Sequence, residues 1–356
     1  MNAQTTENSP KIKRETKNKI RVEFERTSLL TRLRLRFLTG NALGKALWWI
    51  FRFILLLGIS YVILMPFYSK IASSFMSRED FVDVTVKLIP KYPTLDTYKA
   101  IIEENNYFQA LLNTTLLSLL CAVLQTFVCS LIGYGFAKYK FKASKFLFLL
   151  VILTMIIPHK TLHLSLLMKF RYFDIGVGKW GLFNLLGGGM IESFRVLKFT
   201  SINLINSYWP LVILSVTGLG FKNGLYIFMM RQFFRGVPDE LEESAYIDGY
   251  GPFRTFFKII IPISIPMMIT VFLFAFSWQW TDNFYTSVFF NQQGPKLLPD
   301  IIKIPKSLDT SYAGKTLYEA AIRNTCGLMI ITPLIVVYLF CQKFLVQGIE
   351  RSGIVG

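Results

Sequence analysis

The chain has 356 residues, of which 53% are hydrophobic, 15% aromatic and only 17% charged. This composition is too apolar for a water-soluble chain of that length, so a lipid bilayer is the main solvent. The net charge of +17 does not indicate a nucleic-acid partner, because no zinc-finger or RNA-binding pattern accompanies it and membrane proteins retain Lys and Arg on their cytoplasmic side. The four cysteines lie in apolar runs without CxxC spacing, so we expect neither a metal nor a redox site.

Residues 1–47 form a basic leader that we expect to stay in the cytoplasm. The leader carries no apolar segment next to its first charges, so it is not typical of a cleaved signal peptide. The stretch from Leu29 to Trp49 mixes Arg and Lys with Leu, Phe and Trp, as an amphipathic helix at the lipid headgroups does. A disordered basic leader explains this composition equally well.

Six apolar runs approach the length of roughly 20 residues that a helix needs to cross hydrocarbon. The predicted spans are residues 48–69, 109–136, 146–168, 208–231, 259–286 and 323–344. No internal repeat or flexible linker divides this region. The predicted fold class is therefore an all-α polytopic membrane protein with one transmembrane domain over residues 48–356.

The orientation of the spans follows from the short segment between the second and third. It carries four lysines close to two span ends, and such a cluster resists translocation across the membrane. Both termini and the loop between spans four and five are then expected to be cytoplasmic. The lysines are Lys138, Lys140, Lys142 and Lys145, and the long segments on the opposite side are 70–108, 169–207 and 288–322.

The loop over residues 236–258 is predicted to form two short helices separated by a glycine. Pro238 suits a first helical turn, and the acidic residues that follow it complement the positive end of a helix dipole. Gly249 supplies a C-terminal stop, and Pro252 begins a second helix that continues into span five. A surface helix joined in this way to a membrane helix can carry a push from a soluble partner into the bilayer.

The segment ELEESAYIDGYGPFRTFFKIIIP resembles the EAA loop of ABC importer permeases, in which Glu-Ala-Ala and a later Gly precede an apolar stretch ending in Pro. Ser244 stands where the family usually has its first Ala. The resemblance covers roughly residues 50–356 and is strongest to the second permease of carbohydrate importers such as the maltose type. The stretch 177–199 is longer here than in that type.

The resemblance implies a type I ABC importer permease with six transmembrane helices and a cytoplasmic coupling helix, in the plasma membrane of a prokaryote. It implies that this helix docks into a cleft of an ATPase; an ordinary polar loop is the alternative. The implied partners are a second permease in a heterodimer, two ATPase subunits that hold ATP and Mg, an extracytoplasmic binding protein and membrane lipid. The implied coupling residues are Glu242, Glu243, Ser244, Ala245, Asp248 and Gly249.

The sequence contains no Walker A pattern, so we do not expect this chain to bind ATP phosphates. It also offers no catalytic constellation, because His159 and His163 have no carboxylate neighbour. We expect no enzyme activity in this chain. Sugars bind to aromatic faces together with amides and carboxylates, which indicates a substrate path in two segments. The candidates are Trp278, Trp280, Asp282, Asn283 and Tyr285 at the outer end of span five, and Lys222 and Asn223 at a glycine-rich break in span four.

Each path candidate has a structural alternative. The aromatic residues of span five could form an interfacial belt, and Lys222 could snorkel from a tilted helix. The favoured function is transport of a sugar, preferably an oligosaccharide, through a path formed with a second permease. The rival is a secondary transporter driven by an ion gradient, which usually has buried ionisable residues and repeated halves; the sequence shows neither.

Overall fold

The computed structural model describes residues 12–14, 20–22, 40–174, 201–220, 222–291, 294–308, 311 and 314–353. By its internal contacts the chain divides into two compact units, Met1–Ser69 and Lys70–Gly356. The insertion predicted over 177–199 lies outside the described residues. The predicted boundary after residue 47 stays a prediction, since residues 23–39 also lie outside them.

The N-terminal unit contains two three-residue strands, β1 (Ile12–Arg14) and β2 (Ile20–Val22), which pair antiparallel with Ile12 opposite Val22. Helix α2 (Gly40–Ser74) begins within this unit. The C-terminal part of the predicted amphipathic stretch therefore belongs to the same continuous helix as the first span. Its Leu47–Ser74 portion is long and apolar enough to cross a membrane.

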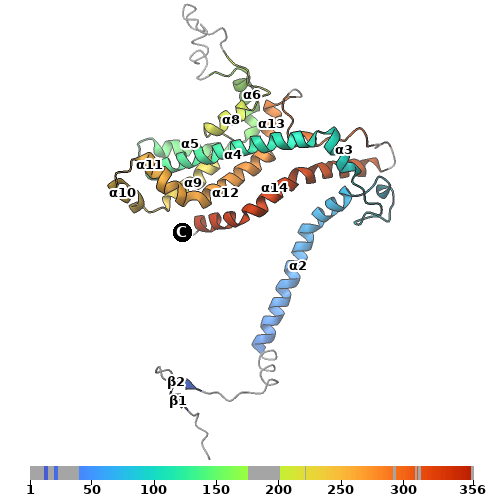
Figure 1. The fold of residues 1–356 in the computed structure, drawn as a ribbon, viewed down its shortest axis with the longest axis horizontal. Coiled ribbons are helices and arrows are strands. Elements are labelled where there is room, and N and C mark those ends of the chain that lie inside the picture. The colour runs from blue at the N-terminus through green and yellow to red at the C-terminus, as the bar shows by residue number, and fades with distance from the viewer. Residues whose placement is uncertain are drawn as a thin grey trace, which may run out of the picture. The chain divides into compact units, whose positions relative to one another are not determined.

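In the C-terminal unit, long helices lie side by side and enclose the main hydrophobic core (Figure 1). Helix α4 (Tyr107–Lys138) packs against α9 (Asn223–Arg235) and α12 (Ile261–Trp280), and α12 packs against α14 (Lys315–Gly353). The inner face of α4 buries several hydroxyl and amide groups. One of them, the Ser130 hydroxyl, donates to the carbonyl oxygen of Thr126 at 2.6 Å, which satisfies a polar group that would be costly to bury alone.

Shorter elements lie at the ends and flank of these helices (Figure 1). Helices α10 and α11 lie at one end of the bundle, and α3 lies at the other. The shorter elements are η1 (Glu79–Phe81), α3 (Asp96–Glu104), α5 (Ser144–Ile156), η2 (His159–Leu162), α6 (His163–Arg171), α8 (Trp209–Val216), α10 (Glu240–Ile247), α11 (Pro252–Thr255), the π-helical turn η5 (Phe256–Ile260), α13 (Phe284–Phe289) and η6 (Leu298–Ile301).

The predicted count of six spans is not confirmed. Among the described residues, four unbroken helices are long and apolar enough to cross a membrane: Leu47–Ser74, Tyr107–Lys138, Pro252–Trp280 and Lys315–Phe344. The predicted third span is instead a pair of helices bent by 97° between Ile156 and His159. Ile157 is extended there, with φ −65° and ψ 123°, because a residue before proline disfavours the helical conformation.

The predicted fourth span is divided as well, at the glycine-rich segment that the sequence marked as a break. Helix α8 ends where Gly218 takes the left-handed conformation, with φ +74°. The amide of Leu219 then donates to the carbonyl oxygen of Leu214 at 3.0 Å, the bond pattern of a glycine-terminated helix. Helix α9 begins only at Asn223.

Helix α9 is held by close approaches to its neighbours at two glycines. A Cβ atom added at Gly133 of α4 would lie 2.8 Å from the Cβ of Met230 and 3.0 Å from the backbone nitrogen of Arg231. A Cβ added at Gly224 of α9 would lie 3.0 Å from the carbonyl oxygen of Val151 in α5. Backbones this close leave no room for a side chain.

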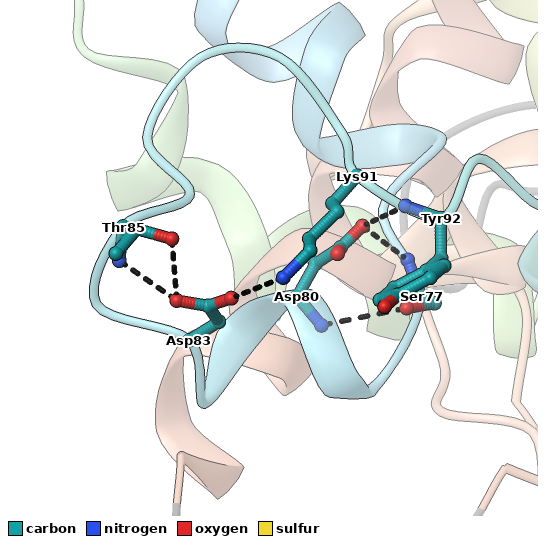
Figure 2. A network of polar contacts seen from close by, with 6 residues as sticks. All are labelled: Ser77, Asp80, Asp83, Thr85, Lys91 and Tyr92. Carbon is teal, nitrogen blue, oxygen red and sulfur yellow. Dashed lines mark hydrogen bonds and ion pairs between the residues drawn. The ribbon is translucent and has the colours of Figure 1, made fainter.

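The loop between α2 and α3 is ordered by two aspartates (Figure 2). Asp80 is buried, and its Oδ2 accepts the backbone N–H groups of Ser77 and Tyr92, both at 3.3 Å. Because the acceptor lies between two parts of the loop that are remote in sequence, it fixes their separation.

Asp83 organises the neighbouring turn of the same loop (Figure 2). Its Oδ1 accepts the Thr85 hydroxyl at 2.6 Å and the Thr85 amide at 2.9 Å, and its Oδ2 lies 3.2 Å from the Lys91 ammonium. The Thr85 bonds, followed by that of Lys91, lower the pKa of Asp83 to about 2. The turn therefore depends on an ionised carboxylate.

Candidate coupling loop and substrate cavity

The loop between α9 and α12 has a helix in the predicted place. Helix α10 covers Glu240–Ile247, and its first turn contains three acidic side chains. The predicted second helix begins at Pro252 and runs through α11 and the π-helical turn η5 into α12. Its continuity with α12 makes Pro252–Trp280 one apolar helical stretch. The assignment of α10 to coupling stays a prediction at this point.

Gly249 ends α10 as the sequence predicts. Its φ of +79° is left-handed, and the Tyr250 amide donates to the carbonyl oxygen of Ala245 at 2.9 Å while the Gly249 amide donates to that of Tyr246 at 3.0 Å. These two bonds form a Schellman motif, which satisfies carbonyl groups at the helix end. The motif sets the direction in which the chain leaves α10.

The predicted coupling residues divide between the two faces of α10. Glu243, Ser244, Asp248 and Gly249 are exposed, whereas Glu242 and Ala245 are buried. Only the exposed set is available to a partner on this face. Glu242 and Ala245 hold the helix to the protein, a division that the motif alone does not reveal.

A buried lysine at the end of α4 fastens α10. The Lys138 side chain is only 6% exposed, and its ammonium lies 2.5 Å from Asp239 Oδ1 and 3.5 Å from Glu242 Oε1. It also donates to the carbonyl oxygen of Val237 at 2.6 Å. Lys138 therefore contacts the chain just before α10 and the buried face of the helix itself.

Tyr134, one turn earlier on α4, completes this contact, which we call the α4–α10 clamp (Tyr134, Lys138, Asp239 and Glu242). Its hydroxyl lies 3.2 Å from Glu242 Oε2. Its ring packs 4.9 Å from that of Phe256 in the π-helical turn. The clamp thus joins α10 to α4 and, through Tyr134, to the π-helical turn that continues into α12, so a displacement of α10 is transmitted to two long helices.

The two segments predicted as a substrate path meet at one cavity of about 200 Å³. Five of the seven predicted path residues line it, contributed by the break before α9, by the end of α12 with the turn that follows, and by the start of α13. These five are Lys222, Trp278, Asp282, Asn283 and Tyr285. Their convergence supports the predicted path without testing it.

The other two predicted path residues do not line this cavity. Asn223 is fully buried, and Trp280 is 2% exposed with its indole Nε1 donating to the carbonyl oxygen of Ile330 at 2.9 Å. Trp280 therefore fastens α12 to α14. Its position two residues from Trp278 places the two indoles on different sides of the helix.

This cavity contains a cation, an aromatic face and a carboxylate that caps a helix. The Lys222 ammonium lies 4.5 Å from the centre of the Trp278 ring, a cation–π contact. The Asp282 carboxylate accepts the backbone N–H groups of Tyr285 and Thr286 at 3.3 and 3.0 Å and so caps α13. An aromatic face beside polar groups is suited to a sugar ring.

Further polar residues that the sequence did not single out line this cavity, among them Gln125, Ser215, Tyr226 and Gln279. Gln125 donates to the Ser215 hydroxyl at 3.1 Å. Among the described residues, the buried Tyr226 hydroxyl and Gln279 Nε2 have no hydrogen-bond partner, so each can bond to water or a solute. A polar residue inside an apolar run was the signal available for all four.

A second cavity, of about 460 Å³, lies beside the first. Lys222 and Phe284 line both cavities, and the second is also lined by the break between α5 and η2 and by His159 and Lys160 at the start of η2. Both broken helices thus end at solvent-accessible space. Within the described residues, no three His, Cys, Asp or Glu side chains gather as a metal site would require.

Comparison with known proteins defines the class. Residues 129–351, well over half of the chain, match the family described as binding-protein-dependent transport system inner membrane component. The chain belongs to this family. It is a multi-pass membrane permease subunit of an ABC transporter and not an enzyme; ATP is hydrolysed in separate chains.

Individual relatives agree with this class. The polygalacturonan/rhamnogalacturonan transport system permease of Bacillus subtilis is 26% identical over 310 residues, covering 85% of this chain and 96% of the relative. The galactooligosaccharides transport system permease of the same organism is 26% identical, covering 86% and 95%. A bacterial ABC transporter for import of the acidic polysaccharide alginate contains a chain with the same fold, at a TM-score of 0.62 and 18% identity, covering 84% and 97%.

Proposed function

We propose that this permease forms, with a second permease, the translocation path for an oligosaccharide delivered by an extracytoplasmic binding protein. Relatives that cover most of both chains belong to transport systems for polygalacturonan/rhamnogalacturonan, galactooligosaccharides and arabinooligosaccharides. The observation that carries the proposal is the cavity where Lys222, Trp278, Asp282, Asn283 and Tyr285 converge. It presents an aromatic face beside polar groups, as a sugar requires.

Coupling to ATP is proposed to occur at the exposed face of α10. Glu243, Ser244 and Asp248 project from a helix whose other face is held by the α4–α10 clamp. We place this helix in a cleft of one of two ATPase subunits. These subunits also bind the ATP and Mg. Movement of the ATPases would then reach α4 and α12 through Lys138 and Tyr134.

The topology proposed with this function places both termini and α10 in the cytoplasm. The lysine-rich segment after α4 supports this orientation. The loop between α2 and α3, with its ordered aspartates, then lies outside the cell, where a binding protein would approach. We propose a prokaryotic plasma membrane as the location, as for the bacterial relatives.

The proposed function is tested by reconstituting the permease pair with its ATPases and binding protein in liposomes. Uptake of a labelled oligosaccharide should require ATP on the ATPase side and should be insensitive to ionophores. Uptake that persists without ATP but stops when ion gradients are collapsed would refute the proposal in favour of a secondary transporter.

A further inference from the structure

The second cavity gathers positive charge from two separate breaks in the helices. Lys160 comes from the turn after α5, and Lys222 comes from the residue before α9. The imidazole of His159 lines the same space. Among the described residues that line this cavity, none is Asp or Glu.

The carboxylate of the first cavity is engaged in the fold. Asp282 lines the first cavity but not the second, and its two oxygens accept the backbone N–H groups at the start of α13. A carboxylate used as a cap is held in place by the backbone. Among the described residues, Lys160 and Lys222 are therefore the charged side chains that line the second cavity.

Lys222 and Phe284 lie between the two cavities, because both residues line both of them. A solute that occupies the first cavity against Trp278 lies next to the ammonium of Lys222, which is 4.5 Å from the centre of that ring. Lys160 lines the second cavity only. The two lysines thus belong to adjacent spaces that share a wall.

Lysines in the membrane part of a protein are costly unless they face water, a partner or an opposite charge, and they mark solute pathways for that reason. A neutral sugar gains little from two ammonium groups. A carboxylate gains charge-assisted hydrogen bonds, which are about twice as strong as neutral ones.

We infer that the cargo is an acidic oligosaccharide, and that Lys160 and Lys222 bind its carboxylates in the second cavity. This inference rests on the proposed function, because it names the chemical class of the sugar. The sugar rings stack on the aromatic side chains of the first cavity while their uronate groups are handed between the two lysines.

The test compares two solutes that differ only in charge. Trigalacturonate and its fully methyl-esterified form are offered to the complete importer, in vesicles of phosphatidylcholine alone so that no anionic lipid headgroup competes for the lysines. Uptake is measured for wild type, for Lys160→Met and Lys222→Met, and for the charge-retaining Lys222→Arg. Lys45→Met, at an exposed lysine of α2 that lines neither cavity, is the matched control.

Wild type and Lys45→Met should take up the acid at least about tenfold faster than the ester, the size expected for one charge-assisted bond. Each Met variant should lose about tenfold of acid uptake and little ester uptake, and Lys222→Arg should retain most acid uptake. Equal uptake of acid and ester by wild type, or an equal loss of both in the Met variants, overturns the inference. If wild type takes up neither trigalacturonate nor its ester, and also no neutral galactotriose, the proposed function itself is refuted.

Discussion

The α4–α10 clamp predicts that Lys138→Met separates ATP hydrolysis from transport. Lys138 and Glu242 are nearly buried and 3.5 Å apart, and at an effective dielectric constant of about 20 this separation corresponds to about 5 kcal/mol of attraction. Removing one member of a buried ion pair costs about 3–5 kcal/mol, because the remaining charge stays buried. We therefore expect α10 to lose its fixed position.

The assay measures ATP hydrolysed per oligosaccharide transported in proteoliposomes, together with retention of the ATPases on the purified permease. Lys138→Met should raise the ATP cost of each transported molecule or release the ATPases. The double variant Lys138→Met/Glu242→Gln should recover part of the loss, because it leaves no buried charge. Normal coupling in Lys138→Met would contradict the clamp, and so would a double variant that is as defective as the single one.

Three further predictions follow from particular residues. Glu243→Lys reverses an exposed charge on α10, so ATP hydrolysis should continue while uptake falls, and unchanged coupling in transport assays would count against docking there. Gly133→Ala should lower the free energy of unfolding by about 1–3 kcal/mol through overpacking and should lower the thermal unfolding temperature in detergent. Gly135→Ala should not, because a Cβ added there meets no atom within 4 Å among the described residues. Equal temperature shifts in the two variants would disprove the close crossing of α4 and α9. The pKa of Asp83 is lowered to about 2, so its loop should keep its protection from hydrogen exchange above about pH 4 and lose that protection as the pH falls towards 2. Asp83→Asn should remove this pH-dependent transition. An unchanged transition in Asp83→Asn would exclude Asp83 as its source.

The sequence predicted the long helices because they depend on uninterrupted apolar runs. It also predicted the end of α10 at Gly249, since a glycine after an acidic helical turn specifies a local backbone conformation. It did not predict the bend at Pro158, because hydropathy averages over a window and does not record backbone direction. Hydropathy therefore predicts a continuous third span, whereas the glycines of the fourth span mark its break in the sequence.

The candidate site was only partly predictable for a different reason. Trp278 and Lys222 were identified by residue type, but their contact joins parts of the chain more than 50 positions apart. Glu242 was grouped with Glu243 because both belong to one motif, and only packing against Lys138 separates them. Single polar residues of apolar helices, such as Gln125, became informative once the fold placed them at a cavity.

We propose that this chain is one half of a transport path driven by separate ATPases. The decisive experiment determines the subunit composition of the complex purified through a tag on this chain, with the mass of the intact assembly. The complex should contain one copy of this permease, one of a second permease and two ATPase subunits, with ATP-dependent oligosaccharide uptake after reconstitution. A self-sufficient monomer that transports its solute without any ATPase would contradict it.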